Sequence, residues 1–506
     1  MTSLNAKRKR PLELTVAING ALGLGGSSAL IVLKLATSVI IARSLGAESF
    51  GIYILAMAVI YFFETIALLG AENTLVKFVS QFRAQADAPR LRGTMFFCFA
   101  LVSMVSVLVC ASLLATKGVL AQRIFDKPQL TPVLAIMALS IPLSNCLTMQ
   151  LASLRGVKLI KYSVLVRQLL MPLFQLAAVI LAVLLGYHLQ GVAWAYVITT
   201  LFGATCGGYF LLRNFPELLQ RGSTISEPRT IASFSLPLLL SAILNRIIGR
   251  VDIFLLGYYL PAQLVGIYGV AKRFLPLIQI PLGAFNNIFA PVISDLFARG
   301  EHEELRRQFQ TVTKWVCTLS LPIFTLITFF SKELLSVFGP EFVAGSQAML
   351  LLCIGQIASA GTGSTGFMLM MTGRPLANLA NSAFLCVISI MLNVWMIPRF
   401  GILGAACASA FSLTMVQILR LAEVWYFLKM QPYREDVLKP IFSCLFSALI
   451  LSAIIRLGVD PSQMLLLFML FGLFLLTYAG SLRVLGLSAD DYVLVNSVKE
   501  RLFSTK

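Results

Sequence analysis

The sequence repeats itself at Leu45-Gly46-Ala47-Glu48-Ser49-Phe50-Gly51-Ile52-Tyr53 and again, 215 positions later, at Leu260-Pro261-Ala262-Gln263-Leu264-Val265-Gly266-Ile267-Tyr268. Each copy follows one long apolar block and leads into the next. Self-similarity at a fixed distance indicates a chain built from repeated structural units. The motif therefore predicts two similar halves. The apolar blocks around it indicate the class of protein.

Those blocks indicate an integral membrane protein. Of the 506 residues 58% are hydrophobic and 12% are charged, which is about half the charged share of a soluble domain. A hydrocarbon core about 30 Å thick needs about 20 apolar residues per helix. The apolar blocks fall at about 16–42, 47–70, 93–115, 131–153, 162–186, 190–212, 233–259, 264–290, 311–331, 346–371, 376–398, 402–428, 438–457 and 462–481. Their continuity predicts an all-α protein with about 14 transmembrane helices and argues against a barrel of short alternating strands.

The distribution of basic residues predicts the orientation. An even number of spans puts both termini on one side, and the termini with every second loop carry 27 of the 40 Lys and Arg residues, against seven in the opposite loops. Cytoplasmic loops carry the excess of basic residues, so both ends are expected in the cytoplasm. The net charge of +18 then reflects topology and gives no argument for nucleic acid.

Further matches extend the repeat over six spans. They pair Asn73 with Asn287 and Ser80 with Ser294 at an offset of 214, Gly156 with Gly373 at 217, and Gly191-Val192-Ala193 with Gly404-Ala405-Ala406 at 213. Six spans per unit give two halves of the same topology, with a cavity expected between them. We predict an N-terminal half at 1–213, a linker at 214–232, a second half at 233–428, two appended helices at 429–481 and a cytoplasmic tail at 482–506.

A family resemblance follows from these features. The signature Arg246-(x)3-Arg250-Val251-Asp252-Ile253-(x)3-Gly257-Tyr258-Tyr259-Leu260, running into the second copy of the motif, resembles the polysaccharide-exporter branch of the multidrug/oligosaccharidyl-lipid/polysaccharide (MOP) flippase superfamily. Thr372-Gly373-Arg374 and Gly404-Ala405-Ala406 are similar to the exit of its tenth span and the entry of its twelfth. The resemblance covers nearly the whole chain.

The resemblance implies a bacterial inner-membrane flippase for undecaprenyl-pyrophosphate-linked oligosaccharide, of the O-antigen translocase type. Such a protein is no enzyme and needs no cofactor, although a coupling ion (H+ or Na+) is open. Its expected partners are the lipid-linked oligosaccharide, membrane lipids, polysaccharide polymerase and chain-length proteins. The alternatives are a drug or cation antiporter of the same superfamily, which would favour acids in its cavity, and a membrane glycosyltransferase or polymerase, which would need a substantial external loop.

Cations inside the apolar blocks are the candidate substrate-binding residues, because a charge at mid-bilayer costs at least about 2.5–3.5 kcal/mol. Lys34 lies in the first span, and Arg246 and Arg250 share one face of the seventh, four residues apart. The repeat places Lys34 next to the position of Arg250. A cationic cavity suits a pyrophosphate head group, since arginine presents a planar fork of donors. Lys272 and Arg273 are weaker additional candidates.

Acids in the spans could carry a coupling ion or pair with these cations. Asp252 is expected to be a salt-bridge partner, Glu423 to pair locally with Arg420, and Glu64 to do either. Glu72 is another available partner for the arginines.

Glycines in the tenth span also match a nucleotide-binding pattern. The stretch 361–366 reads G-x-G-x-x-G, but no strand precedes it, so close helix packing or local unwinding is the better interpretation. The nine cysteines include no C-x-x-C pair, and we predict no metal site.

Overall fold

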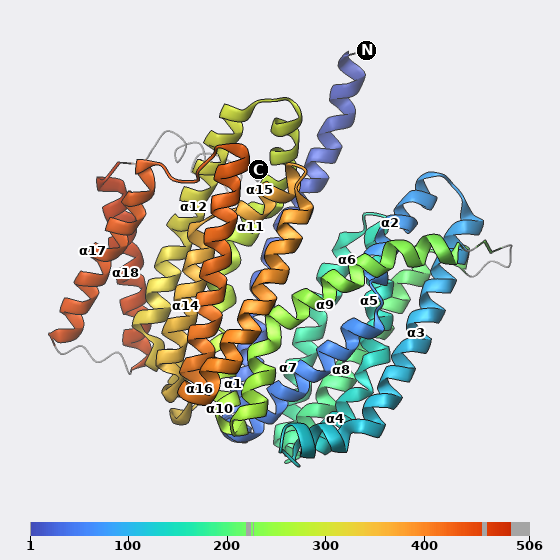
Figure 1. Ribbon diagram of the computed structural model, residues 1–506, viewed down its shortest axis with the longest axis horizontal. Helices are drawn as coiled ribbons and strands as arrows, with labels where there is room; N and C mark the ends of the chain where they lie inside the picture. The colour runs from blue at the N-terminus through green and yellow to red at the C-terminus, as the bar shows by residue number, and fades with distance from the viewer. Residues whose placement is uncertain (1, 219–223, 226, 458–462, 487–506) are drawn as a thin grey trace. The chain divides into compact units, whose positions relative to one another are not determined.

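The computed structural model describes residues 2–218, 224–225, 227–457 and 463–486, and these residues are almost entirely helical with no β-strand among them (Figure 1). The all-α prediction is thereby confirmed. The helices are α1 (Thr2–Ala67), α2 (Ala71–Ala84), α3 (Ala88–Gly118), α4 (Leu130–Ala138), α5 (Ser140–Gly156), α6 (Ile160–Val164), α7 (Met171–Leu184), α8 (His188–Asn214), α9 (Pro228–Tyr259), α10 (Ala262–Lys272), α11 (Leu275–Ala298), α12 (His302–Phe329), α13 (Ser331–Ser336), α14 (Ser346–Gly361), α15 (Thr365–Met371), α16 (Pro375–Leu428), α17 (Leu438–Arg456) and α18 (Met464–Val484). Short π or 3-10 turns are η1 (Val119–Ile124), η2 (Leu165–Leu170), η3 (Pro216–Leu218), η4 (Pro340–Gly345) and η5 (Glu435–Val437).

Twelve helices in the described part of the chain are long and apolar enough to cross a membrane. Two of them contain a backbone break, at Gly46 (φ 74°) in α1 and at Gly401 (φ 59°) in α16. These breaks fall between predicted spans one and two and between spans eleven and twelve. The fourteen apolar blocks therefore correspond, in chain order, to these helices and their segments. That the chain crosses the membrane fourteen times stays a prediction.

The chain packs into two compact units. The first comprises residues 1–270 and 389–405, and the second comprises residues 271–388 and 406–506. Within the first unit α5 packs on α2, α3 and α8, and α7 packs on α8 (Figure 1). Within the second unit α12 packs on α11 and α14, and α17 pairs with α18. The predicted division at 214–232 describes the repeat and stays a prediction.

Glycines explain why α10 joins the first unit. A Cβ on Gly51 would lie 1.8 Å from the carbonyl oxygen of Ala262, and one on Gly266 would lie 2.1 Å from the carbonyl oxygen of Ala47. The two backbones are therefore in direct contact. These glycines occupy the same position in the two copies of the nine-residue motif, so the repeated motif is itself a helix-crossing point.

Left-handed turn residues recur at the repeat distance. Ala86 (φ 54°) and Gly300 (φ 73°) stand 214 positions apart. Lys158 (φ 64°) stands 215 positions before Gly373 (φ 84°). Gly186 (φ 75°) likewise stands 215 positions before Gly401. These pairs place corresponding turns in the two halves.

One of the sequence matches needs correction. Gly373 has a left-handed conformation, whereas Gly156 is the last residue of α5 and packs against Val79. The structural counterpart of Gly373 is therefore Lys158 at an offset of 215, and the match at 217 is wrong. Lysine tolerates a left-handed turn poorly, so the sequence signal of that turn is hidden in the first half.

The glycine-rich stretch of the tenth span is unwound, and local unwinding was one of the two interpretations of its sequence. Helix α14 ends at Gly361, Gly363 has a φ of 64°, and α15 begins at Thr365. A Cβ on Gly363 would also lie 2.2 Å from the hydroxyl of Thr313. Unwinding and close packing therefore occur together at this position.

Candidate functional site

Two of the predicted cations meet at one aromatic ring in the first unit. The guanidinium carbon of Arg246 lies 5.5 Å from the ring centroid of Tyr61, and that of Arg250 lies 5.3 Å from it. Both arginines belong to α9, where residues four apart share one face of the helix. Tyr61 belongs to α1. Arg246 also donates from Nε to the Thr65 hydroxyl at 2.8 Å. The predicted shared face is thus directed at one short segment of α1.

Arg250 lies inside an apolar span beside an aromatic ring. Among the described residues no carboxylate lies within ion-pair distance of its guanidinium, which lies at the Tyr61 ring. The side chain is half-buried inside an apolar span. A cation in such surroundings is costly unless an anion or water reaches it, so this group can receive an anion.

Glu64 lies beside the same segment and is buried. Its carboxylate hydrogen-bonds to Ser144 and is attracted by Arg246 and by Arg167, while its Oε1 atom has no hydrogen-bond partner. The Glu64 carbonyl oxygen accepts from Asn145 at 3.3 Å. Glu64 therefore links the arginines of α9 to a second polar group on α5 and η2.

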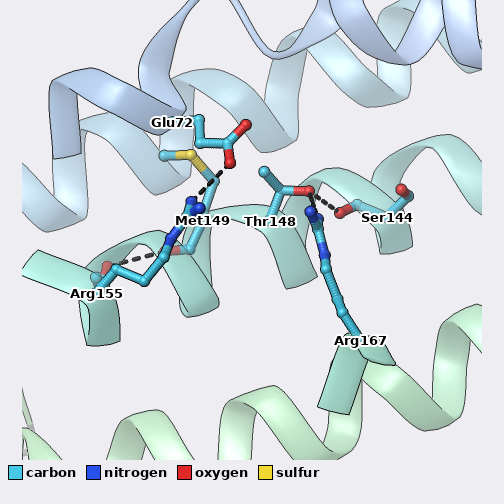
Figure 2. A network of polar contacts seen from close by, with 7 residues as sticks. Glu72, Ser144, Thr148, Met149, Arg155 and Arg167 are labelled. Atoms are coloured by element: carbon cyan, nitrogen blue, oxygen red, sulfur yellow. Dashed lines mark hydrogen bonds and ion pairs between the residues drawn. The ribbon is translucent and has the colours of Figure 1, made fainter. Parts of the chain in front are cut away.

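Figure 2 shows that second group. Arg167 donates to the Thr148 hydroxyl, and that hydroxyl donates to the Ser144 carbonyl at 2.8 Å. Beside it, Arg155 forms an ion pair with Glu72 at 2.6 Å. These contacts join α2, α5 and η2 inside the first unit. Glu72, one of the acids available to the α9 arginines, is therefore the partner of Arg155.

Arg167 is a further cation inside a span, and it is not among the candidates named from the sequence. It lies on the π-helical turn η2, inside the apolar helix 160–184. Its guanidinium is attracted by Glu72 and Glu64. The signal was available, because the apolar run continues on both sides of Arg167, but the basic cluster around 155–161 conceals it.

Asp252 is buried and accepts two hydrogen bonds. Its Oδ2 accepts from the Tyr268 hydroxyl at 2.7 Å, and its Oδ1 accepts from the backbone N–H of Ile253 at 2.8 Å. Tyr268 belongs to the second copy of the nine-residue motif. Asp252 thus ties α9 to α10, and its predicted role as a salt-bridge partner stays a prediction.

The remaining candidates lie elsewhere in the chain. Lys34 is exposed on α1 of the first unit. Lys272 ends α10 and Arg273 follows it, both half-buried and both in the second unit. Their predicted contact with substrate stays a prediction.

Glu423 in α16 accepts a hydrogen bond from the Asn381 amide at 2.5 Å. Arg420 attracts it electrostatically, but among the described residues no ion-pair contact joins the two. The direct partner is therefore Asn381 rather than Arg420. Arg420 lies instead near Gly366, with Nη1 3.6 Å from the position of a Cβ there. In the described residues no cluster of three His, Cys, Asp or Glu could hold a metal ion.

Comparison with known proteins adds a family. A family described as "Polysaccharide biosynthesis protein" matches residues 40–343, which is more than half of the chain. The "Probable low-salt glycan biosynthesis flippase Agl15" of Haloferax volcanii is 25% identical over 197 residues. That alignment covers 39% of this chain and 42% of the relative, so the match spans less than half the length of that protein.

Solved structures share the fold. The "Lipid II flippase MurJ, inward closed conformation" has a TM-score of 0.73 at 12% identity, covering 91% of this chain and 97% of that one. A "multidrug resistance MATE family transporter of the MOP superfamily" in an inward-facing conformation has a TM-score of 0.68 at 13% identity, covering 79% and 94%. Flippases and transporters move a substrate, which accords with a protein that is no enzyme. The predicted resemblance is confirmed: this multi-pass membrane protein belongs to the polysaccharide biosynthesis protein family and has the fold of the MOP superfamily transporters.

Proposed function

We propose that the protein is a flippase that moves a polyprenyl-pyrophosphate-linked oligosaccharide from the cytoplasmic to the outer leaflet of a bacterial inner membrane. The observation that carries the proposal is Arg250, a guanidinium inside an apolar span with an aromatic ring and, among the described residues, no carboxylate at ion-pair distance. The family match and the flippase relative support a lipid-linked glycan as the substrate class. O-antigen or exopolysaccharide repeat units are the proposed cargo.

The proposed recognition uses charge and geometry together. A guanidinium binds phosphate through two parallel N–H···O bonds, which a lysine does not reproduce. Arg246 and Arg250 both lie at the Tyr61 ring, so the two guanidinium groups are close to one another. Arg246 would attract the substrate phosphate less strongly than Arg250, because the Glu64 carboxylate already attracts its guanidinium. The lipid tail would remain in the bilayer while the polar head group crosses by alternating access.

Several further features are part of the proposal. Both termini would be cytoplasmic, H+ and Na+ are the candidate coupling ions, and the product would pass to a polysaccharide polymerase and chain-length proteins. Lys34, Lys272 and Arg273 would add positive charge along the path. A drug or cation antiporter of the same superfamily is the alternative, and the two differ in whether the working cavity is cationic.

The test measures translocation in proteoliposomes that carry a lipid-linked oligosaccharide. Arg250→Gln is expected to lower the initial rate at least about tenfold, since a lost charge-assisted hydrogen bond costs about 1.5–3 kcal/mol, and Arg250→Lys should restore part of it. Arg123→Gln is the matched control, because Arg123 is exposed at the end of η1. Unchanged transport in Arg250→Gln and Arg246→Gln would contradict the cationic mechanism, and transport of a cationic drug by the wild type would favour the antiporter.

A further inference from the structure

A pocket separate from the arginine site opens where two spanning helices of the first unit begin. It has a volume of about 430 Å³, within the size range of small-molecule sites. Its walls come from α2, from the start of α3 and from the start of α9. The lining includes the cations Lys77 and Arg90 and the rings of Phe78, Phe82 and Phe234.

The pocket lies at a membrane boundary. The helices 88–124 and 228–259 are both candidate spans, and their first residues border it. Ile225 donates its backbone N–H to the Pro89 carbonyl at 3.1 Å, which holds the two helix starts together. The pocket is therefore placed at the depth of lipid head groups, where polar and apolar groups meet.

Its lining combines charge with aromatic surface. Phe78 stacks on Phe82 with ring centroids 5.8 Å apart, and it meets Phe234 edge-on at 5.9 Å. The Lys77 ammonium lies 3.7 Å from the centroid of the Phe234 ring and 5.3 Å from that of Phe78. A cation over an aromatic face is attracted to the ring, so Lys77 lies against the apolar wall.

The cations of the pocket are not equivalent. Arg90 lies between two carboxylates, with Nε 3.6 Å from Asp87 and 3.5 Å from Glu227. Its charge is therefore already balanced. Lys77 is exposed, and among the described residues no carboxylate lies within ion-pair distance of its ammonium. Lys77 is thus a cation without a carboxylate at ion-pair distance beside three phenylalanine rings, while Arg90, Asp87 and Glu227 interact with one another.

We propose that this pocket binds the head group of an anionic membrane phospholipid, with the phosphate on Lys77 and the glycerol and upper acyl chain against Phe78, Phe82 and Phe234. The Gln81 amide and the Thr230 hydroxyl line the same space and supply donors to phosphate oxygens. A soluble phosphate would leave the aromatic wall unused. A neutral or cationic head group would leave Lys77 uncompensated. The site is independent of the arginines proposed to bind the cargo.

The experiment measures how much labelled phosphatidylglycerol the full-length protein retains after exchange from phosphatidylglycerol-containing vesicles into phosphatidylcholine vesicles. Lys77→Gln is expected to weaken retention about fivefold, since one lysine at a membrane surface is worth about 1 kcal/mol toward anionic lipid. Thr230→Trp, which fills the pocket but keeps Lys77, should weaken it as well. Lys161→Gln is the matched control, because Lys161 also lies over an aromatic ring, Tyr162 at 5.0 Å, outside the pocket. It should retain lipid like the wild type.

Three results would overturn the proposal. Retention in Lys77→Gln and Thr230→Trp equal to that of the wild type would show that the pocket holds no lipid. Displacement of the label by inorganic phosphate would assign the pocket to a soluble anion. Saturation by a polyprenyl phosphate but not by phosphatidylglycerol would make it a cargo site. None of these outcomes depends on the translocation rate, so the proposed function is tested separately.

Discussion

The contact between the two copies of the repeated motif gives a sharp prediction about stability. Gly51→Ala adds a Cβ that would stand 1.8 Å from the Ala262 carbonyl oxygen, 2.7 Å from the Ala262 carbonyl carbon and 2.9 Å from the Gly266 nitrogen. All three atoms belong to backbone, so no side chain can rotate out of the way. Real Cβ contacts are longer than 3.0 Å. The helices α1 and α10 must therefore separate by at least about 1.2 Å at this crossing, given a rigid backbone.

The size of the effect follows from two opposing terms. Replacing glycine by alanine in a helix interior stabilises by about 1 kcal/mol, whereas forcing atoms into a packed contact costs about 1–3 kcal/mol or more. At Gly51 the clash is with backbone, so the cost should exceed the gain. At Gly118 nothing lies within 4 Å of an added Cβ, so only the gain applies there.

The melting temperatures of Gly51→Ala, Gly118→Ala and the wild type are compared in one detergent. Unfolding is detected as the loss of the monodisperse size-exclusion peak after heating. Gly51→Ala should melt below the wild type and Gly118→Ala at or above it. Equal melting temperatures for Gly51→Ala and Gly118→Ala would refute the backbone contact and with it the packing of α10 in the first unit.

Two further predictions test other contacts. The half-exposed pair of Arg155 with Glu72, 2.6 Å apart, should give a coupling energy of about 1 kcal/mol in a double-mutant cycle of Arg155→Gln and Glu72→Gln; additive effects on the free energy of unfolding would speak against a working ion pair. Gly363→Ala should destabilise the protein because its φ is 64° and its Cβ would strike Thr313. The neighbouring Gly361→Ala, with open space around it, should not; a reversed order of their melting temperatures would count against the unwound turn.

Much of the fold was predictable because each membrane-spanning helix consists of a contiguous run of apolar residues. The predicted blocks are mostly helical in the described residues, with interruptions inside them at 273–274 and 362–364, and the breaks at Gly46 and Gly401 fall where the apolar blocks divide. The repeat was also visible in the sequence, because both copies of the motif have glycine at the same position. At Gly51 and Gly266 the two backbones touch and leave no room for a side chain. The match of Gly156 with Gly373 failed because lysine occupies the left-handed turn in the first half.

The candidate site was predictable only in part. Helical periodicity places Arg246 and Arg250 on one face, and both indeed lie at the Tyr61 ring. Partners distant in sequence carry no such periodic signal. The pairing of Arg155 with Glu72 joins α5 to α2, and the position of Arg167 depends on the π-helical turn η2. A hydropathy profile reports the depth of a residue and says nothing about which helix face it shares with another.

Passage of a lipid-borne anionic glycan across the membrane past Arg250 can be measured by following leaflet exposure in time. Proteoliposomes carrying a pyrophosphate-linked oligosaccharide are mixed with an impermeant glycosidase that cleaves only sugars on the outer leaflet. Wild-type protein should bring the sugar of the inner leaflet into reach of the enzyme, and Arg250→Gln should slow this at least about tenfold relative to Arg123→Gln. Exposure no faster than in protein-free vesicles, or equally fast in both variants, would contradict passage past Arg250.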